Sequence, residues 1–442
     1  MKSKKKIHIE TYGCQMNFSD SEIVMSVLAD TYEHTSDIKS ADLILINTCS
    51  IRDNAEARIW NRLKEIRSLK KRNKSLKIGI IGCMAERLKE QWLEKEAIID
   101  LVVGPDAYRD LPKLLQTVAG GQNAINTILS EEETYADISP IRYNTNGISA
   151  FVSIMRGCQN FCSYCVVPYT RGKERSRDPK SILNEAQQLF DEGYREITLL
   201  GQNVNSFFWN ENDDEVHFWD LMAMVAKINP LLRIRFATSH PKDLSNELIQ
   251  TIASFPNICK SIHLPVQSGS NNMLKKMNRK YTREWYLGRI AEIKKQIPDC
   301  SLSTDIIAGF CDETEQDHQD TLSIMREVGY EAAYMFKYST RPGTLAHKKF
   351  DDNVSEELKI KRLQEIINLQ QELSLISNKK DIGKIMEVLI EGFSKRSKEH
   401  QFGRNSQNKV VVFPKTDLEK GNYVNVQITE CSAATLKGFV VD

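Results

Sequence analysis

Short apolar runs alternate with amphipathic stretches in the first part of the chain. Helical periodicity predicts helices at Asp20–Leu28, Asn54–Leu69 and Leu111–Val118, and Ser19 is a candidate cap for the first of them. Four apolar runs are typical of buried strands: Lys6–Thr11, Ala41–Asn47, Leu76–Ile81 and Ile98–Val103. Strands that alternate with helices form parallel sheets covered on both faces. We therefore expect a doubly wound, parallel α/β domain over residues 1–125.

A second α/β series begins near Phe151, after a polar stretch at 126–145 that has the composition of a linker. Six strand candidates follow: Phe151–Met155, Ile197–Leu200, Leu232–Thr238, Ser261–Val266, Ser301–Ile307 and Ala332–Tyr338. Helices are predicted between and after them: Lys180–Asp191, Asn246–Ser254, Arg283–Gln296, Thr314–Val328 and Ser355–Ser377. This succession fits an incomplete (β/α)6 barrel over residues 146–378.

The pattern changes again over residues 379–442. Short β-rich runs are separated there by glycines and polar turns, at Ile385–Ile390, Lys409–Phe413, Tyr423–Ile428 and Thr435–Val441. Such a pattern is typical of a small antiparallel β-barrel of OB-like size.

Composition excludes some classes of protein. The chain is 41% hydrophobic and 27% charged, and it contains no apolar run long enough to predict a membrane span. The basic start leads into a polar strand instead of the apolar stretch of a signal peptide, so we expect a cytoplasmic protein. A net charge of +1 gives no overall argument for nucleic acid, and a monomer is the default expectation.

Three cysteines form a C-x3-C-x2-C run, Cys158, Cys162 and Cys165, directly after the first barrel strand. Three thiolates on one loop can hold three irons of a 4Fe-4S cube and leave the fourth iron open. A zinc loop and buried structural thiols are the alternatives, although zinc commonly uses two separated cysteine pairs. The placement at a strand end, where β/α barrels carry their sites, favours the cluster.

Three further cysteines are far apart in the sequence: Cys14, Cys49 and Cys83 each follow a predicted parallel strand. Neighbouring strand ends of a doubly wound sheet open on the same crevice, so these cysteines can converge. Buried structural cysteines remain the alternative, because free cysteine is often interior. The shared placement at strand ends favours a second cluster with three thiolate ligands.

These segments resemble the radical S-adenosylmethionine (SAM) methylthiotransferases. The run CQNFCSYCVVPYTRGKERSR, from Cys158 to Arg177, is similar to their SAM-cluster loop. TYGCQMN, NTCSIRDNAEARI and GCMAERLK, which contain the other three cysteines, are similar to their amino-terminal cluster domain, and residues 379–442 resemble the TRAM domain, an RNA-binding barrel. The residues after Cys49 resemble the MiaB branch of the family. That branch makes the 2-methylthio derivative of N(6)-isopentenyladenosine at position 37 of tRNA.

The resemblance implies two 4Fe-4S clusters and two SAM molecules per turnover. One SAM would methylate sulfur held at the auxiliary cluster on Cys14, Cys49 and Cys83, and the other would be cleaved reductively at the second cluster. It also implies tRNA as substrate, a reductase or flavodoxin-type electron donor, and a sulfur donor. Branches that act on threonylcarbamoyladenosine in tRNA or on a ribosomal protein are alternatives, as is a zinc-containing RNA-binding module without catalysis.

Less specific candidates surround the barrel cysteines. By resemblance, Tyr164 contacts the adenine of SAM, and the residues at the end of the second strand, Gln202 and Asn203, hold its amino group. Polar residues at later strand ends are further candidates for SAM binding: Ser239, His263, Gln267 and Asp305. His263 fits a satisfied core histidine equally well.

The segment from Gly403 to Lys409 resembles the TRAM loop that meets RNA. Arg404 and Lys409 would pair with phosphates and Asn405 would lie between them, which would make binding salt-dependent. An ordinary polar hairpin loop is the alternative for this stretch.

Overall fold

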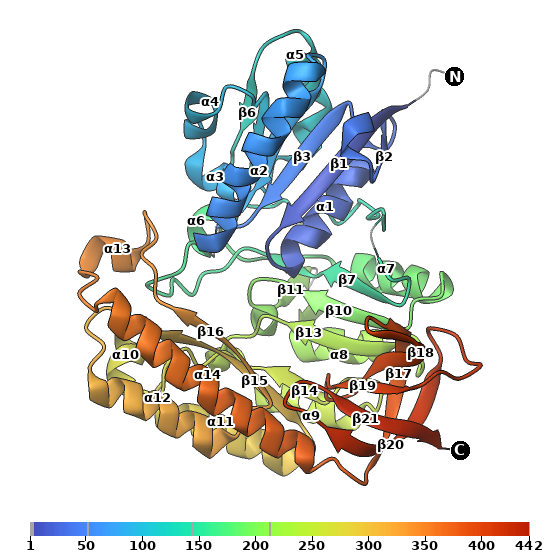
Figure 1. Cartoon of the computed structure of the whole chain (residues 1–442), viewed down its shortest axis with the longest axis vertical. Coiled ribbons are helices and arrows are strands. Elements are labelled where there is room, and N and C mark those ends of the chain that lie inside the picture. Colours follow the sequence, from blue (N-terminus) through green and yellow to red (C-terminus); the bar gives the residue numbers. More distant parts are fainter. Residues whose placement is uncertain (1–3, 51–52, 144, 212–213, 442) are drawn as a thin grey trace.

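The chain folds into three parts that follow one another along the sequence (Figure 1). The computed structural model describes residues 4–50, 53–143, 145–211 and 214–441. An α/β unit lies above a half-open barrel, and a small β-barrel packs at one end of that barrel.

The amino-terminal unit is a six-stranded sheet with the order β2-β1-β3-β4-β5-β6, and every neighbouring pair is parallel. Its strands are β1 (Lys5–Tyr12), β2 (Tyr32–His34), β3 (Leu43–Thr48), β4 (Lys77–Gly82), β5 (Leu101–Val103) and β6 (Ala124–Asn126). Helices α1 (Gln15–Leu28) and α5 (Leu111–Ala119) pack on one face. The other face carries α2 (Asp53–Arg72), α3 (Cys83–Leu88) and α4 (Gln91–Lys95). This is the doubly wound arrangement that the sequence pattern predicts.

The start of α1 was predicted wrongly. The helix begins at Gln15, and Cys14, not Ser19, is its N-cap. The side chain of Asn17 accepts a hydrogen bond from the backbone N–H of Cys14 (3.3 Å), which stabilises the first turn. The polar residues at the start of the helix hide its periodicity, because Asn17 and Ser21 contact Asn47 of β3 instead of forming an apolar stripe.

The barrel consists of two three-stranded parallel sheets, β13-β10-β7 and β14-β15-β16. A single bridge, Ile234 with Ile258, joins them. The strands are β7 (Ser149–Ser153), β10 (Glu196–Leu200), β13 (Arg233–Ala237), β14 (Ser261–His263), β15 (Ser301–Ala308) and β16 (Ala332–Lys337). The helices around them are α7 (Pro179–Asp191), α8 (Phe218–Ala226), α9 (Asn246–Ser254), α10 (Asn271–Lys276), α11 (Arg283–Gln296), α12 (Glu315–Val328) and α14 (Glu356–Lys379). The (β/α)6 prediction is confirmed.

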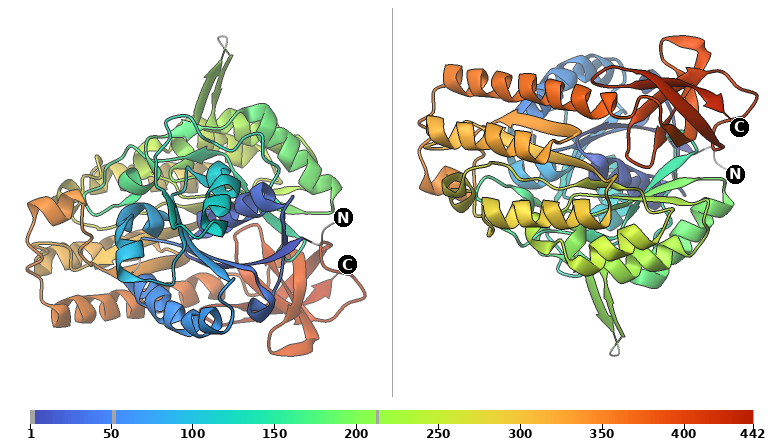
Figure 2. Two further views of the ribbon diagram at one scale, coloured as in Figure 1. Left: turned by 90° about the horizontal axis from the view of Figure 1, so that it is seen from above. Right: turned by 90° about the horizontal axis from the view of Figure 1, so that it is seen from below.

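Helices α8 and α10 and one hairpin of the barrel part have no counterpart in the sequence prediction. Strands β11 (Phe208–Glu211) and β12 (Asp214–His217) form an antiparallel hairpin that projects from the body of the molecule (Figure 2). The hairpin buries few apolar residues. The alternation of apolar and polar residues along its strands is therefore weak and does not predict them.

The last part is a closed barrel with the order β17-β18-β19-β21-β20. Its strands are β17 (Ile385–Ser394), β18 (Ser397–Asn405), β19 (Val410–Pro414), β20 (Tyr423–Cys431) and β21 (Leu436–Val441). All neighbours are antiparallel except β19 and β21, which are parallel. Strand β18 was missed because its sequence, SKEHQFGRN, is almost wholly polar.

The stretch at 126–145 is more firmly packed than a linker. Tyr135 is 2% exposed, and its hydroxyl donates to the carbonyl of Pro105 (2.9 Å). Arg142 pairs with Glu22 of α1 and with Glu185 of α7, so this stretch joins the first two parts. Among the residues that the structure describes, no helix combines the length and the apolar character that a membrane span requires.

Candidate active site at two cysteine groups

Strand register brings the three amino-terminal cysteines to one edge of the sheet. Thr48 of β3 lies opposite Tyr12 of β1 and opposite Gly82 of β4, so three strand ends form one row. Cys83 follows its strand directly, Cys49 follows Thr48, and Cys14 is two residues past Tyr12. The convergence that strand-end placement predicted is present in the structure.

Two glycines allow the chain to come this close. A side chain at Gly13 would place its Cβ 2.7 Å from the Cβ of Cys49 and 2.4 Å from the Asn17 amide oxygen. Gly82 has a φ of +90°, and a Cβ there would lie 2.4 Å from the amide oxygen of Asn47. Each glycine directly precedes a cysteine, a signal that the sequence carried and that the prediction did not use.

A buried amide pair holds the cysteine loops together. The amide nitrogen of Asn17 donates to the side-chain oxygen of Asn47 (2.9 Å), and the amide of Asn47 donates back to the Asn17 carbonyl (2.8 Å). The thiol of Cys14 donates to the Asn17 amide oxygen (3.3 Å). Both asparagines are fully buried, so each lost hydrogen bond would leave an unsatisfied polar group.

The thiols interact with one another and with a cation. A hydrogen bond with Cys49 lowers the pKa of the Cys14 thiol to about 6 against the opposing effect of burial, and the charge of Arg171 lowers it further. Burial raises the pKa of the Cys83 thiol, although Arg171 opposes this. The Nε of Arg171 donates to the Cys83 sulfur at 3.2 Å. Arg171 belongs to the barrel part of the chain, and no pattern in the sequence indicates this contact.

The barrel cysteines lie on a loop after β8 (Met155–Arg156) that is fixed at several points. The N–H of Cys158 donates to Gly172 (3.1 Å), the N–H of Ser163 to Met277 (3.0 Å), and the N–H of Cys165 to Cys162 (2.9 Å). Burial raises the pKa of the Cys158 thiol to about 11. The loop is therefore held in shape by backbone contacts that do not depend on the side-chain sulfurs.

Each sulfur of this loop has a nearby N–H donor. Asn160 donates to Cys158 (3.6 Å), Arg279 to Cys162 (3.2 Å), and the backbone of Val167 to Cys165 (3.4 Å). Donors to sulfur are the groups that stabilise thiolate ligands of a cluster. Arg279 is 4% exposed and also donates to the Pro265 carbonyl (2.7 Å), so its position is rigid.

Each cysteine group offers the three cysteine ligands that a 4Fe-4S cube can take. Among the described residues, no three His, Cys, Asp or Glu side chains form a group that could hold one metal ion. A cube makes a different demand, because each of three irons takes its own cysteine and the thiolates need not meet at one point. Both cysteine groups supply three thiols and a buried arginine that donates to one of them.

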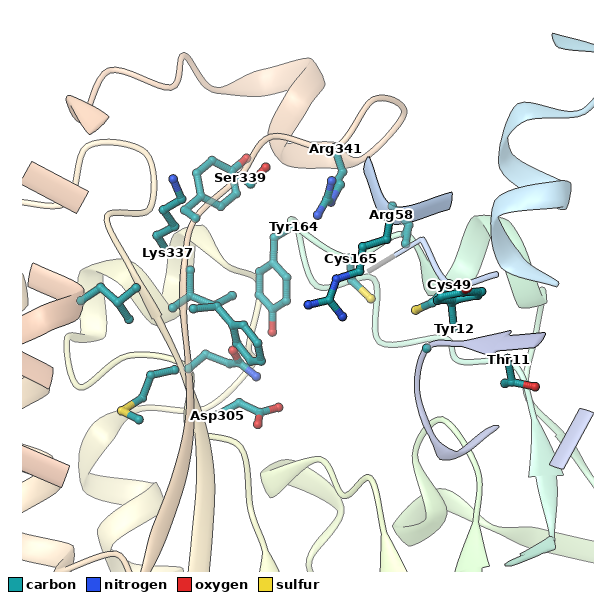
Figure 3. Close-up of a pocket in the computed structure, with 18 of the residues that line it drawn as sticks. Thr11, Tyr12, Cys49, Arg58, Tyr164, Cys165, Asp305, Lys337, Ser339 and Arg341 are labelled. Carbon is teal, nitrogen blue, oxygen red and sulfur yellow. The ribbon is translucent and has the colours of Figure 1, made fainter. Parts of the chain in front are cut away.

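A cavity of about 730 Å³ lies between the two groups. Cys49 and Tyr12 line it from the amino-terminal unit, whereas Cys165 and Tyr164 line it from the barrel (Figure 3). The volume is in the range of small-molecule sites. The other lining residues include polar or charged ones, Arg58, Gln267, Asp305, Lys337 and Arg341, and apolar ones, Val166, Ile307, Met335 and Leu363.

Three of the predicted SAM-binding residues, Tyr164, Gln267 and Asp305, line this cavity. Gln267 has a φ of +72°, a strained conformation of the kind that concentrates at functional sites. Of the others, Gln202 accepts from the backbone N–H of Gly157 beside the cluster loop, and His263 contacts Ser303 (3.0 Å).

The last two predicted residues, Asn203 and Ser239, are both buried, and Asn203 contacts the residue that follows Ser239. The amide of Asn203 donates to Asp243 (2.7 Å) and accepts from the N–H of His240 (3.0 Å). The hydroxyl of Ser239 has no hydrogen-bond partner among the described residues. The role of these residues towards SAM stays a prediction.

The residues predicted to meet RNA have internal partners. Arg404 forms an ion pair with Glu391 (2.7 Å), Lys409 forms one with Asp381 (2.6 Å), and Asn405 is 1% exposed. The backbone carbonyls of Arg404 and Asn405 accept from Arg233 (2.7 Å) and Arg235 (2.8 Å) of the barrel. This loop therefore docks the small β-barrel on the larger one, and a role in RNA binding stays a prediction.

Comparison with known proteins defines the class. Three family models match: the uncharacterized protein family UPF0004 at residues 6–104, the radical SAM superfamily at 152–325, and the TRAM domain at 379–441. Membership of the radical SAM superfamily implies a 4Fe-4S cluster and SAM. The protein is thus a radical SAM enzyme.

Close relatives narrow the class. A protein of Amoebophilus asiaticus is 58% identical over 98% of this chain and 92% of its own length, and one of Bacteroides fragilis is 58% identical over 98% and 95%. A Flavobacterium johnsoniae protein is 54% identical over 99% and 94%. All three are named tRNA-2-methylthio-N(6)-dimethylallyladenosine synthase. The chain belongs to this family of methylthiotransferases.

Solved structures support the fold at low identity. The radical SAM methyltransferase TsrM from Kitasatospora setae superposes with a TM-score of 0.58 at 13% identity, covering 78% of this chain and 75% of that chain. The cobalamin-dependent radical SAM enzyme OxsB gives 0.51 at 13% identity, covering 83% and 56%. These likenesses concern the fold alone.

Proposed function

We propose that this enzyme places a methylthio group on C2 of N(6)-dimethylallyladenosine at position 37 of tRNA. The observation that carries the proposal is that one cavity is lined by a cysteine from each group, Cys49 and Cys165. Transfer of a methylthio group to C2 needs both a radical and a sulfur source, and both must lie close to that carbon atom. The relatives named for this reaction support the choice of substrate.

We also propose that Cys158, Cys162 and Cys165 hold the SAM-binding 4Fe-4S cluster, and that Cys14, Cys49 and Cys83 hold an auxiliary one. When bound, the first cluster and SAM supply the radical chemistry that an unactivated aromatic C–H requires. The chain itself orients the cluster loop through its backbone contacts with Gly172 and Met277. Tyr164, Gln267 and Asp305 would position SAM from the cavity wall.

The cavity suits a modified adenosine that has left its stack. A nucleoside must be splayed out of the anticodon loop before an enzyme can reach its base. The apolar residues Val166, Ile307 and Met335 offer a surface for the dimethylallyl group, and Arg58 offers a cation for phosphate. The second SAM molecule of each turnover would donate its methyl group to sulfur at the auxiliary site.

Further parts of the proposal rest on the family and the reaction. The domains are proposed to span 1–125, 146–378 and 379–442, joined by 126–145, and the three family matches fall inside these limits. Reductive cleavage consumes an electron, so a reductase or flavodoxin-type donor is needed, together with a sulfur donor. The enzyme would act in the cytoplasm as a monomer.

Nucleoside analysis tests the function. In a host whose own methylthiotransferase gene is deleted, the chain should restore 2-methylthio-N(6)-dimethylallyladenosine in tRNA digests analysed by mass spectrometry. Cys259→Ser serves as a control, because Cys259 is buried just before the start of β14, where its N–H donates to Ile234 near the start of β13 (2.9 Å), whereas the cysteine loop follows the end of a strand. A methylthio group on threonylcarbamoyladenosine or on a ribosomal protein instead would overturn the choice of substrate. Zinc without iron in the reconstituted protein would overturn the radical chemistry.

A further inference from the structure

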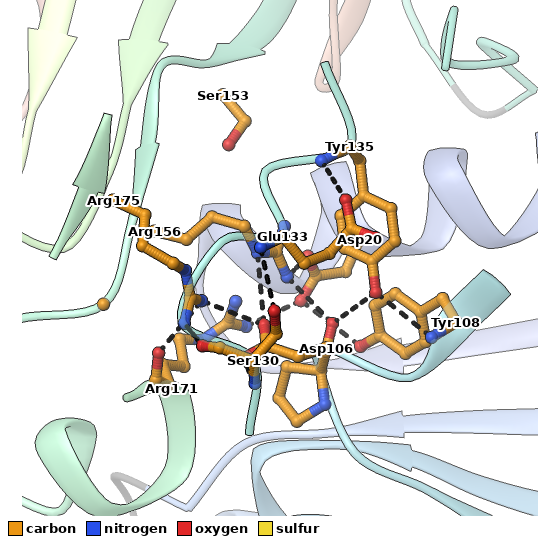
Figure 4. Close-up of polar contacts among 12 residues, drawn as sticks. Asp20, Asp106, Tyr108, Ser130, Glu133, Tyr135, Ser153, Arg156, Arg171 and Arg175 are labelled. Atoms are coloured by element: carbon orange, nitrogen blue, oxygen red, sulfur yellow. Dashed lines mark hydrogen bonds and ion pairs between the residues drawn. The ribbon is translucent and has the colours of Figure 1, made fainter. Parts of the chain in front are cut away.

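Five charged side chains are buried together where the amino-terminal unit meets the barrel (Figure 4). Two aspartates come from the amino-terminal unit, Asp20 of α1 and Asp106 after β5. Three arginines come from the barrel part: Arg156 of β8, Arg171 of α6 (Val167–Arg171) and Arg175 of β9 (Arg175–Ser176). None of the five is more than 9% exposed.

Asp20 is the centre of this group. One carboxylate oxygen accepts from Arg156 (2.9 Å) and the other accepts from Arg171 (2.7 Å). Asp106 pairs with Arg175 (3.0 Å) and lies 3.7 Å from the Nε of Arg156. Arg156 and Arg171 flank the SAM-cluster loop in the sequence, so the loop is anchored at both ends to the unit that carries the other cysteines.

The charges in this group do not balance. Three arginines face two aspartates, which leaves one positive charge in excess when all five are ionised. Glu86, which also interacts with Asp106, forms its own ion pair with Lys89 (3.4 Å) and adds no net charge. A buried charge without a partner is costly, so the group favours a further anion close by.

Arg171 shows where that anion belongs. Its Nη2 is used by Asp20, and its Nε donates to the sulfur of Cys83 (3.2 Å). Its Nη1 is buried and has no hydrogen-bond partner among the described residues. Arg171 is 2% exposed, so water cannot take that role easily. Two of its three donor groups are thus directed away from Asp20, at least one of them towards the cysteine group.

We infer that Arg171 is a positioning residue for the auxiliary cluster, donating a hydrogen bond to the sulfur of Cys83 and raising the reduction potential of that cluster. The inference rests on the proposed function, which places a cluster on Cys14, Cys49 and Cys83. An excess positive charge and N–H donors to sulfur stabilise the more negative, reduced state of a cluster. Arg171 would in this way link the reduction potential of the auxiliary cluster to the position of the SAM-cluster loop.

A purely structural role is the competing explanation, because Arg171 also holds Asp20. Arg175 provides the matched control: it is buried in the same group and pairs with Asp106 and with the carbonyl of Arg171 (3.2 Å). The described contacts of Arg175 include no cysteine. A residue that only fixes the interface should behave as Arg175 does.

The test uses the full chain with Cys158, Cys162 and Cys165 changed to alanine, so that only the proposed auxiliary cluster forms. Iron is counted after anaerobic reconstitution, and the cluster is titrated with a reductant while its absorbance and EPR spectrum are followed. Arg171→Met should lower the reduced-to-oxidised ratio at a fixed potential at least tenfold, which for one electron is about 59 mV. Arg171→Lys should shift it less, because the charge remains, and Arg175→Met should also shift it less, because that change removes a charge from the same group but no donor to sulfur.

Each outcome has a defined meaning. An unchanged potential in Arg171→Met, or an equal shift in Arg175→Met, overturns the inference while the two-cluster proposal stands. A background chain that binds no cluster overturns the two-cluster proposal itself. If Arg171→Met loses its iron, Arg171→Lys decides: a shifted potential supports the inference, and the parent potential overturns it.

Discussion

The two cysteine groups reach similar chemistry by opposite routes. Cys158, Cys162 and Cys165 lie on one short loop, whose shape is set by backbone contacts such as that between Cys165 and Cys162 (2.9 Å). Cys14, Cys49 and Cys83 come from three strands and meet only because Tyr12, Thr48 and Gly82 are in register. The first site is formed by one segment of the chain, whereas the second depends on the pairing of three strands.

This difference predicts different sensitivities. The local site depends on its ligands and on a few fixed contacts, whereas the assembled site depends on any residue that controls the approach of three strand ends. In both, a buried arginine from outside the ligand segments donates to one sulfur, Arg279 to Cys162 and Arg171 to Cys83.

The largest effect is expected from the local site. Cys162→Ala removes one iron ligand and should abolish SAM cleavage, because a three-cysteine loop has no spare thiolate. Formation of 5′-deoxyadenosine under reducing conditions measures this. Cys259→Ala should cleave SAM at the parent rate, and measurable cleavage by Cys162→Ala would contradict the ligand assignment.

Cys49→Ala should separate the two sites. We expect SAM cleavage to continue while methylthio insertion stops, because only the proposed auxiliary cluster loses a ligand. Deoxyadenosine and methylthiolated nucleoside are measured in the same reaction. Equal loss of both products would show that the sites do not divide the chemistry as proposed.

Gly13→Ala tests the assembled geometry without touching a ligand. Its Cβ would meet the Cβ of Cys49 at 2.7 Å and the Asn17 amide oxygen at 2.4 Å, so the strand ends must separate. Iron after reconstitution should fall from about eight to about four per chain, the content of one cube. Gly288→Ala is the control, since nothing lies within 4 Å of that Cβ. Full iron content in Gly13→Ala would mean that close approach is unnecessary.

Arg279→Lys should have the smallest effect, on the local site alone. Lysine has one nitrogen in place of the guanidinium group, so it loses the hydrogen bond to Cys162 or the one to the Pro265 carbonyl. Loss of such a supporting contact typically lowers activity about tenfold. SAM cleavage should fall by about that factor while the auxiliary cluster, isolated by removing the loop cysteines, keeps its potential. A change in that potential would show that the two arginines are not specific to their own sites.

Much of the fold could be read from the chain because it rests on periodicity. Buried runs such as those of β3 and β4 are mostly apolar, and helices such as α7 and α9 keep an amphipathic spacing. Two of the elements that were missed lack such a signal: β18 is polar, and the β11–β12 hairpin buries little. The start of α1 was misplaced because Asn17 hydrogen-bonds to Asn47 of β3 instead of contributing to an apolar face.

The sequence by itself determined the barrel-loop cysteines, since their spacing and their place after a strand are local properties. It also placed three more cysteines at strand ends. Only the tertiary structure decided that Arg171 contacts Cys83, that Cys49 and Cys165 line one cavity, and that Arg404 pairs with Glu391. The physical reason is that such contacts join residues far apart in the chain, and packing and charge balance select them without leaving a periodic trace.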